Sequence, residues 1–240
     1  IRLSLVGSEM CIRDSYYCAC NKVVTRHHER AARYLDALAQ DIALHVRELG
    51  AGVPVSQLHF GGGTPTFLSD DELTRLMQDL RAGFRFEPDA EISIEVDPRT
   101  ATPARLAHLR QLGFNRLSFG VQDFDQRVQV AVHRVQSFED VRALMQSARA
   151  LGYDSVNVDL IYGLPLQTTE SFARTISQVV TLRPDRIALY AYAHLPERFK
   201  PQRRINESDL PDRATRVGLL SSAIDGFLPV SYTHLTLPTS

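Results

Sequence analysis

The chain has 240 residues, of which 44% are hydrophobic and 23% are charged, and its formal net charge is −1. These values are ordinary for a globular protein and exclude a collagen-like, low-complexity or wholly disordered chain. The balanced charge gives no electrostatic argument for binding nucleic acid or an anionic membrane, and no apolar run approaches the roughly 20 residues that span a bilayer.

Apolar spacing predicts an alternation of helices and strands along the chain, and Ser69 is the expected N-cap of one helix. The predicted helices cover residues 26–49, 70–82, 103–112, 137–151, 169–182 and 212–227. The predicted strands cover residues 55–60, 91–96, 116–120, 155–161 and 186–192, with a sixth strand before Cys18 and a loop over 201–211. Such an alternation with short links is typical of βαβ units around a parallel sheet.

Three of the predicted strands have one apolar and one polar face. In residues 91–96 and 155–160 every second side chain is apolar, and Glu95 and Asp159 fall on the polar side. Residues 116–120 alternate in the same way. The strands of a doubly wound sheet are buried on both faces and are continuously apolar. The polar faces therefore favour an open or partial barrel around a polar ligand, and edge strands with a solvated face are the alternative.

All three cysteines, Cys11, Cys18 and Cys20, fall in the first twenty residues. This clustering favours a metal or redox role in a reducing, cytoplasmic compartment over a disulfide framework. Cys11 and Cys18 occupy the first and third positions of a C-x3-C-x2-C pattern, in which thiolates bind the iron of a cluster. Ser15 stands at the second position. A stray pair of thiols is the alternative interpretation.

A second motif, Gly61-Gly62-Gly63-Thr64, follows the strand predicted over residues 55–60. Glycines allow unusual φ angles and a close approach of the backbone to a ligand. The motif is not G-x-G-x-x-G, so it does not support a Rossmann fold. A tight turn between strand and helix is the alternative interpretation. We assign no role to His59 or to the adjacent His27 and His28.

Together, several segments in order resemble the oxygen-independent coproporphyrinogen III oxidases, which are radical S-adenosylmethionine (SAM) enzymes. The matching segments are residues 16–22 (YYCACNK), 57–66 (QLHFGGGTPT), 92–98 (ISIEVDP), 120–124 (GVQDF), 159–165 (DLIYGLP) and 192–196 (YAHLP). The resemblance extends, more weakly, to Phe227. The Cys-x-Cys that ends at Cys20 favours an oxidase over the related haem chaperones, which bind haem without oxidase activity. An inactive fragment is the third alternative.

This resemblance implies an α/β fold, a truncated partial (β/α)6 TIM-like barrel of the radical SAM type. It divides the chain into a non-matching segment at 1–15, the barrel at 16–228 and a non-matching tail at 229–240, with the family's C-terminal domain absent. It implies a [4Fe–4S] cluster, S-adenosyl-L-methionine, and oxidative decarboxylation of two propionates of coproporphyrinogen III to the vinyl groups of protoporphyrinogen IX. The implied partner is an electron donor or acceptor protein, and we expect a cytoplasmic monomer that binds neither nucleic acid nor membrane.

The resemblance also assigns site residues by position, although no catalytic residue among them. Cys18 matches a cluster ligand, and Cys11 has the spacing of another. The implied cofactor-binding residues are Tyr17, Gly62, Gly63, Thr64, Glu95, Gln122, Arg134, Asp159 and Ala193. Since 25 of the 27 basic residues are arginine, structural ion pairs are the alternative for the two carboxylates, as is a surface position for Arg134. A serine hydroxyl is a poor ligand for cluster iron, so Ser15 and the truncation predict impaired activity.

Overall fold

The computed structural model describes residues 2–6, 9–11, 15–19, 22–24, 29–230 and 232. The chain separates into two compact units. The first unit contains residues 1–13, 20–118 and 147–154, and the second contains residues 14–19, 119–146 and 155–240. Within the described ranges, none of the helices has the length and apolar character needed to cross a membrane.

The described elements alternate along the chain as the sequence predicts. The strands are β1 (Arg2–Val6), β2 (Glu9–Cys11), β3 (Lys22–Val24), β4 (Val53–Gly61), β5 (Phe84–Val96), β6 (Arg116–Gln122), β7 (Ser155–Tyr162) and β8 (Arg186–Ala191). The helices are α1 (Glu29–Leu49), α2 (Asp70–Gly83), α3 (Pro103–Gln111), α4 (Gln126–Ala131), α5 (Phe138–Ala150), α6 (Thr169–Leu182) and α7 (Arg213–Phe227). Short 3₁₀ turns are η1 (Pro65–Phe67), η2 (Lys200–Arg204), η3 (Glu207–Asp209) and η4 (Leu228–Val230). The strand expected before Cys18 is β1.

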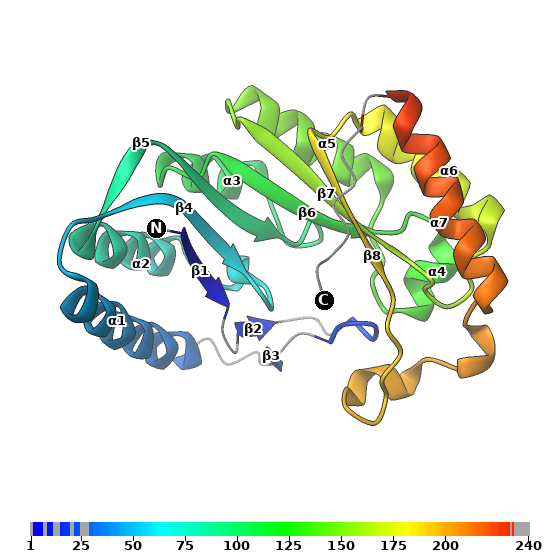
Figure 1. Ribbon diagram of the computed structural model, residues 1–240, viewed down its shortest axis with the longest axis horizontal. Coiled ribbons are helices and arrows are strands. Elements are labelled where there is room, and N and C mark those ends of the chain that lie inside the picture. Colours follow the sequence, from blue (N-terminus) through cyan, green and yellow to red (C-terminus); the bar gives the residue numbers. More distant parts are fainter. Residues whose placement is uncertain are drawn as a thin grey trace. The chain divides into compact units, whose positions relative to one another are not determined.

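In the first unit, β1, β4 and β5 lie side by side in this order and run parallel, and β6 begins next to β5. The register places Leu58 of β4 opposite Leu3 of β1 and Ile92 of β5. Helices α1 and α2 pack against each other (Figure 1). Ser69 begins α2 as predicted, because its hydroxyl accepts from the backbone N–H of Glu72 while the Glu72 carboxylate accepts from that of Ser69.

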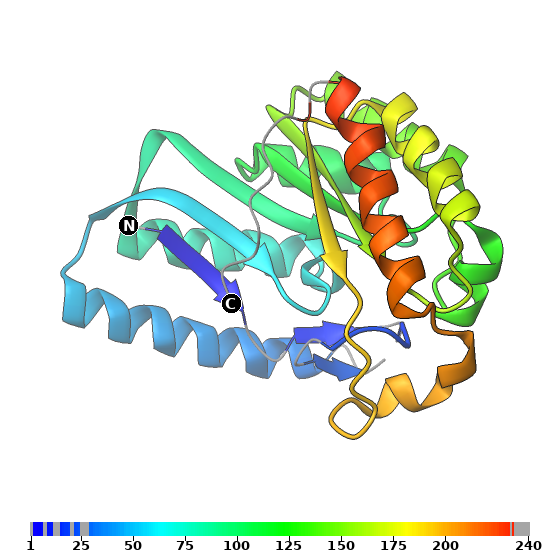
Figure 2. The ribbon, with the colours of Figure 1, turned by 45° about the vertical axis from the view of Figure 1, so that its right-hand side comes forward.

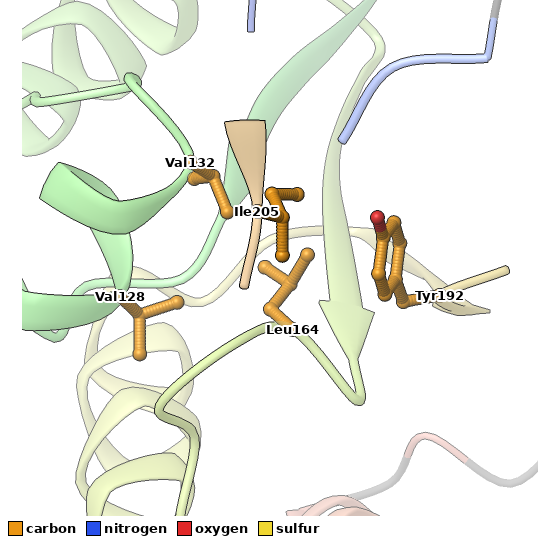
Figure 3. Close-up of a cluster of buried hydrophobic side chains, with 5 residues drawn as sticks. All are labelled: Val128, Val132, Leu164, Tyr192 and Ile205. Carbon is orange, nitrogen blue, oxygen red and sulfur yellow. The ribbon is translucent and has the colours of Figure 1, made fainter. Parts of the chain in front are cut away.

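In the second unit, the end of β6 is followed by β7 and then β8, and the last two strands are parallel. Helices α6 and α7 lie side by side (Figures 1 and 2). They come close at Gly226, where a Cβ would lie 2.5 Å from Cγ2 of Ile176. A separate apolar cluster joins α4, the loop after β7, the end of β8 and η2 (Figure 3). Its buried members are Val128, Val132, Leu164, Tyr192 and Ile205.

The strand faces agree with the alternation predicted from the sequence. Within residues 91–96, 116–121 and 155–160 of β5, β6 and β7, the apolar side chains are buried and their polar neighbours are half-buried. The buried set comprises Ile92, Ile94, Val96, Leu117, Phe119, Val121, Val156, Val158 and Leu160. Each of these strands therefore packs one face in a core and leaves a polar face for other contacts.

One helix was not predicted, and one loop prediction is wrong. Helix α4 was not expected, because six residues are too few to reveal a helical apolar period, yet Asp125 caps its start and Val128 is buried. Residues 201–211 are not a simple polar loop, because they contain parts of η2 and η3. Gln202 and Ile205 are buried there, so tertiary packing gives this polar stretch its structure.

Candidate functional site

The glycine loop and Glu95 meet at the carboxyl ends of β4 and β5 in the first unit. Gly62 has a φ of 117°, a left-handed value that favours glycine, and its N–H donates to Glu95 Oε2 at 3.2 Å. Gly63 and Thr64 continue the loop, and the Thr64 hydroxyl donates to the Gly63 carbonyl at 2.8 Å. The Glu95 side chain remains 40% exposed. This corner therefore offers a partly solvated carboxylate beside a glycine backbone that a ligand can approach closely.

His59, to which no role was assigned from the sequence, also belongs to this corner. Its Nδ1 lies 2.8 Å from Ser93 Oγ, and its Nε2 lies 3.6 Å from Glu95 Oε1. A Cβ at Gly61 would lie 2.5 Å from His59 Nε2 and 2.9 Å from Glu95 Oε1. Among the residues whose side chains are described, Glu95 thus pairs with a histidine rather than with an arginine. His59 and Gly61 share the polar face of β4, and that alternation was the available signal.

Gln122 and Arg134 come together at the end of β6 in the second unit. Gln122 has a φ of 68°, which is uncommon for a residue other than glycine. Arg134 is only 7% exposed, and its Nη2 donates to the Gly120 carbonyl at 2.6 Å. The alternative that Arg134 lies on the surface is therefore wrong. A Cβ on Gly120 would lie 2.9 Å from both Arg134 Nη2 and Gln122 Nε2. The bare backbone of Gly120 lets both side chains approach this strand end.

Asp123, which directly follows Gln122, is a buried residue without a predicted role. Its carboxylate accepts from the backbone N–H of Asp125 and the Thr175 hydroxyl, each at 2.7 Å, and from Gln167 Nε2 at 2.5 Å. Burial raises the pKa of the Asp123 carboxyl, although these hydrogen bonds oppose the shift. Gln167 Oε1 in turn accepts two backbone N–H groups of the loop after β7. This network fixes the backbone immediately beyond Gln122.

Asp159 and Ala193 occupy the other two predicted positions of the second unit. Asp159 is half-buried on the polar face of β7 and accepts from Asn157 Nδ2 at 2.7 Å. Ala193 follows β8 and is exposed, and its carbonyl accepts from Gln202 Nε2 at 3.1 Å. A half-buried carboxylate on a polar strand face suits hydrogen bonds from hydroxyl or ammonium groups of a ligand.

The segment around Cys18 also belongs to the second unit. The Cys18 N–H donates to the Ser15 carbonyl at 3.2 Å, and the Tyr16 N–H donates to the Val132 carbonyl at 2.9 Å. Tyr17 packs on the apolar cluster of Figure 3, and its carbonyl accepts from the side-chain amide of Gln202 at 2.9 Å. Cys18 is half-buried, whereas Ser15 is 4% exposed. The segment is therefore folded and held in place by residues of its own unit.

The cluster ligands are only partly covered by the described residues. Cys11 lies in β2 but its side chain is outside them, and Cys20, His27 and His28 lie wholly outside. Where side chains are described, no group of three or more His, Cys, Asp or Glu residues is placed to hold a metal ion. A buried serine hydroxyl at the second ligand position does not fit a [4Fe–4S] cluster, which requires thiolates. The polar strand ends and the glycine loop do fit a polar cofactor.

Comparisons with known proteins agree with these features. The model of the radical SAM superfamily matches residues 5–179. The chain is 48% identical to the oxygen-independent coproporphyrinogen III oxidase of Pseudomonas aeruginosa over 235 residues, which cover 95% of this chain and 51% of that protein. It is 49% identical to the enzyme of the same name from Escherichia coli over 233 residues, covering 95% and 51%. The chain thus spans about half the length of the curated relatives it matches.

One solved structure is very similar. The coproporphyrinogen III oxidase (HemN) of Escherichia coli, described as a radical SAM enzyme, superposes with a TM-score of 0.92 at 48% identity. The match covers 98% of this chain and 54% of that chain. It confirms the predicted α/β fold class, a partial barrel of the radical SAM type.

Proposed function

Because the chain belongs to the radical SAM superfamily, whose model matches residues 5–179, we propose that it is the barrel portion, residues 16–228, of an oxygen-independent coproporphyrinogen III oxidase. The reaction is the oxidative decarboxylation of two propionates of coproporphyrinogen III to vinyl groups in porphyrin biosynthesis. The observation that carries the proposal is the 48% identity to named oxidases over nearly the whole chain. A cytoplasmic monomer that exchanges electrons with a partner protein completes the proposal.

Each unit carries its own set of side chains for S-adenosyl-L-methionine. In the first unit, Glu95 would accept a hydrogen bond from the cofactor's ammonium group while the loop Gly62–Thr64 receives its methionine end. In the second unit, Asp159 would accept from ribose hydroxyls, and the resemblance assigns Tyr17, Gln122, Arg134 and Ala193 to cofactor binding. The cofactor supplies the reactive group, and the protein supplies position and exclusion of water.

The described residues do not fit the iron–sulfur cluster. Cys18 matches a ligand position, but Ser15 contributes a hydroxyl where a thiolate is needed. We therefore propose that the chain assembles a [4Fe–4S] cluster poorly and that its oxidase activity is impaired.

The direct test is turnover by the chain in which Ser15 has been changed to cysteine. After anaerobic reconstitution with iron and sulfide, it is given S-adenosyl-L-methionine, a low-potential reductant and coproporphyrinogen III. Loss of CO2 from the porphyrinogen and a vinyl-bearing product, measured by mass spectrometry, are expected. Tight haem binding without a vinyl product would contradict the oxidase and support a relationship to the haem chaperones.

Replacing Glu95 with glutamine is expected to weaken binding of S-adenosyl-L-methionine by about tenfold or more. A hydrogen bond to a charged group contributes about 1.5–3 kcal/mol, and about 1.4 kcal/mol corresponds to a factor of ten in affinity. Titration calorimetry measures the change. Asp89→Asn is the matched control, because Asp89 is an exposed carboxylate on the same strand. An equal loss of affinity in both variants would show that Glu95 does not contact the cofactor.

Replacing Gly120 with alanine is expected to weaken the same binding by about tenfold, since a methyl group displaces both Gln122 and Arg134. The displaced atoms are ends of flexible side chains, so thermal unfolding should shift by only a few degrees. Gly218→Ala in α7 is the control, because its Cβ would meet only Thr169 Oγ1 at 3.6 Å. Unchanged affinity in Gly120→Ala would show that neither displaced side chain contacts the cofactor.

A further inference from the structure

Gln202 connects three separate segments of the second unit through one side chain. It lies in η2 and is completely buried, with 0% exposure. Its Nε2 donates to the carbonyls of Tyr17 at 2.9 Å and Ala193 at 3.1 Å, and its Oε1 accepts the N–H of Leu195 at 2.6 Å. A primary amide has two N–H donors and one carbonyl acceptor, and Gln202 uses all of these groups on backbone partners.

The position of Gln202 is set by η2 and by the apolar cluster beneath it. The Gln202 N–H donates to the Phe199 carbonyl at 3.0 Å, and its carbonyl accepts the Ile205 N–H at 3.0 Å. Ile205 is in turn packed in the cluster of Figure 3 with Val132 and Tyr192. The turn thus has its own anchor in the core. Gln202 is therefore held in place by its own turn, and its side-chain amide orients the carbonyls of Tyr17 and Ala193.

The bridge fixes one particular peptide group, the one that joins Tyr17 to Cys18. Its carbonyl oxygen accepts from Gln202, and its N–H, which belongs to Cys18, donates to the Ser15 carbonyl at 3.2 Å. A peptide group is planar, so holding both its oxygen and its hydrogen fixes the plane and with it the Cα of Cys18. The point of the backbone from which the Cys18 side chain extends is therefore fixed.

Other anchors of the segment act on Tyr16, the residue before this peptide group. The Tyr16 ring stacks on His133 with ring centroids 5.0 Å apart, and the Arg204 guanidinium lies 5.0 Å from the Tyr16 ring centroid. These contacts fix Tyr16 without orienting the peptide group between Tyr17 and Cys18. Loss of the Gln202 amide would leave the partly buried carbonyls of Tyr17 and Ala193 without that donor.

We propose that Gln202 is a positioning residue that holds the backbone at Cys18, which carries the thiol, and the backbone at Ala193 in a fixed relation. The roles of Cys18 as a cluster ligand and of Ala193 as a cofactor contact rest on the proposed function. The positional effect on Cys18 does not, because it follows from the hydrogen bonds of the second unit. This role of Gln202 could not be predicted, because Gln202 stands in a polar stretch that is typical of a loop.

The rate of alkylation of Cys18 tests this role without any cofactor. In a chain carrying Cys11→Ser and Cys20→Ser, Cys18 is the remaining thiol, and iodoacetamide reports its exposure and mobility. Gln202→Met keeps the length of the side chain and removes its hydrogen bonds. We expect this variant to react at least about fivefold faster than its parent over the whole pH profile, which separates exposure from a shifted thiol pKa.

The matched control is Asn115→Leu. The Asn115 amide makes the same kind of bridge within the first unit, donating to the Ala90 carbonyl at 2.9 Å and accepting the Ile92 N–H at 2.8 Å. It should cost similar stability and leave the Cys18 rate within about twofold of the parent. Equal rates in parent, Gln202→Met and Asn115→Leu would overturn the proposal and leave Gln202 with a purely structural role.

A milder variant keeps the test available if Gln202→Met does not fold. Gln202→Asn retains the amide but is one methylene too short to reach both carbonyls, so it should react at an intermediate rate. A rate equal to that of the parent would again overturn the proposal. The outcome is independent of the oxidase hypothesis, whose own tests are cofactor binding by the Glu95 variant and turnover by the Ser15 variant.

Discussion

Replacing Ser15 with cysteine is expected to raise the iron bound after anaerobic reconstitution from well below one cluster to about four irons per chain, the content of one [4Fe–4S] cluster. Ser15 precedes Cys18 by three residues, and its carbonyl accepts the Cys18 N–H at 3.2 Å, so both residues belong to one folded turn. A thiolate binds iron strongly, whereas a serine hydroxyl stays protonated near neutral pH. Iron and sulfide analysis with visible absorption measures the change.

Two further variants identify the source of any gain. Ser208→Cys adds a thiol at an exposed position in η3 and should leave iron loading at the level of the parent. Cys11→Ser in the Ser15→Cys chain should abolish the gain if Cys11 is the first ligand, as its spacing predicts. A parent chain that already binds about four irons would show that Ser15 is no obstacle and that the alignment of this segment is wrong.

The strands and the Glu95 corner could be predicted because their signals are local. Ile92, Ile94 and Val96 alternate with polar residues, and a period of two is visible in six residues of sequence. The same alternation placed Glu95 on the polar face, where the structure finds it beside Gly62. The position of a side chain along one strand is therefore recoverable without knowledge of its partners.

The burial of Arg134 and Gln202 could not be predicted, because it depends on partners distant in sequence. Arg134 is held by the carbonyl of Gly120, fourteen residues earlier, and Gln202 by that of Tyr17, which lies 185 residues earlier. Neither contact produces a periodic pattern in the sequence, and arginine and glutamine are usually exposed. Helix α4 was not predicted for a related reason. Its few apolar residues pack in a cluster whose other members lie far away in sequence.

Replacing Asp123 with alanine is expected to lower the free energy of unfolding by about 3–5 kcal/mol, because several buried donors lose their acceptor together. Those donors are the Asp125 N–H, the Thr175 hydroxyl and Gln167 Nε2. Urea unfolding followed by circular dichroism measures the loss. Asp225→Ala, at an exposed position in α7, should change stability by less than about 0.5 kcal/mol. Similar values for the two variants would show that the Asp123 network adds nothing to the fold.

The isosteric change Asp123→Asn tests the titration of this carboxyl, because asparagine keeps the shape and cannot ionise. Burial raises the folded-state pKa of Asp123 above its ordinary value of 3.8. The folded state then holds the proton more tightly than the unfolded state, so this group stabilises the fold most below pH 3.8. That contribution is lost as the pH rises through the raised pKa, and the stability of the parent relative to the Asn variant should fall over the same range.

The opposite slope would carry a distinct physical meaning. If the stability of the parent relative to Asp123→Asn rose with pH, the ionised carboxylate would be the favoured form in the fold. The donors from Asp125, Gln167 and Thr175 would then outweigh the cost of burial, since hydrogen bonds to a charged acceptor stabilise it more than those to a neutral one. Unfolding curves of both chains at closely spaced pH values therefore decide whether desolvation or hydrogen bonding controls the residue next to Gln122.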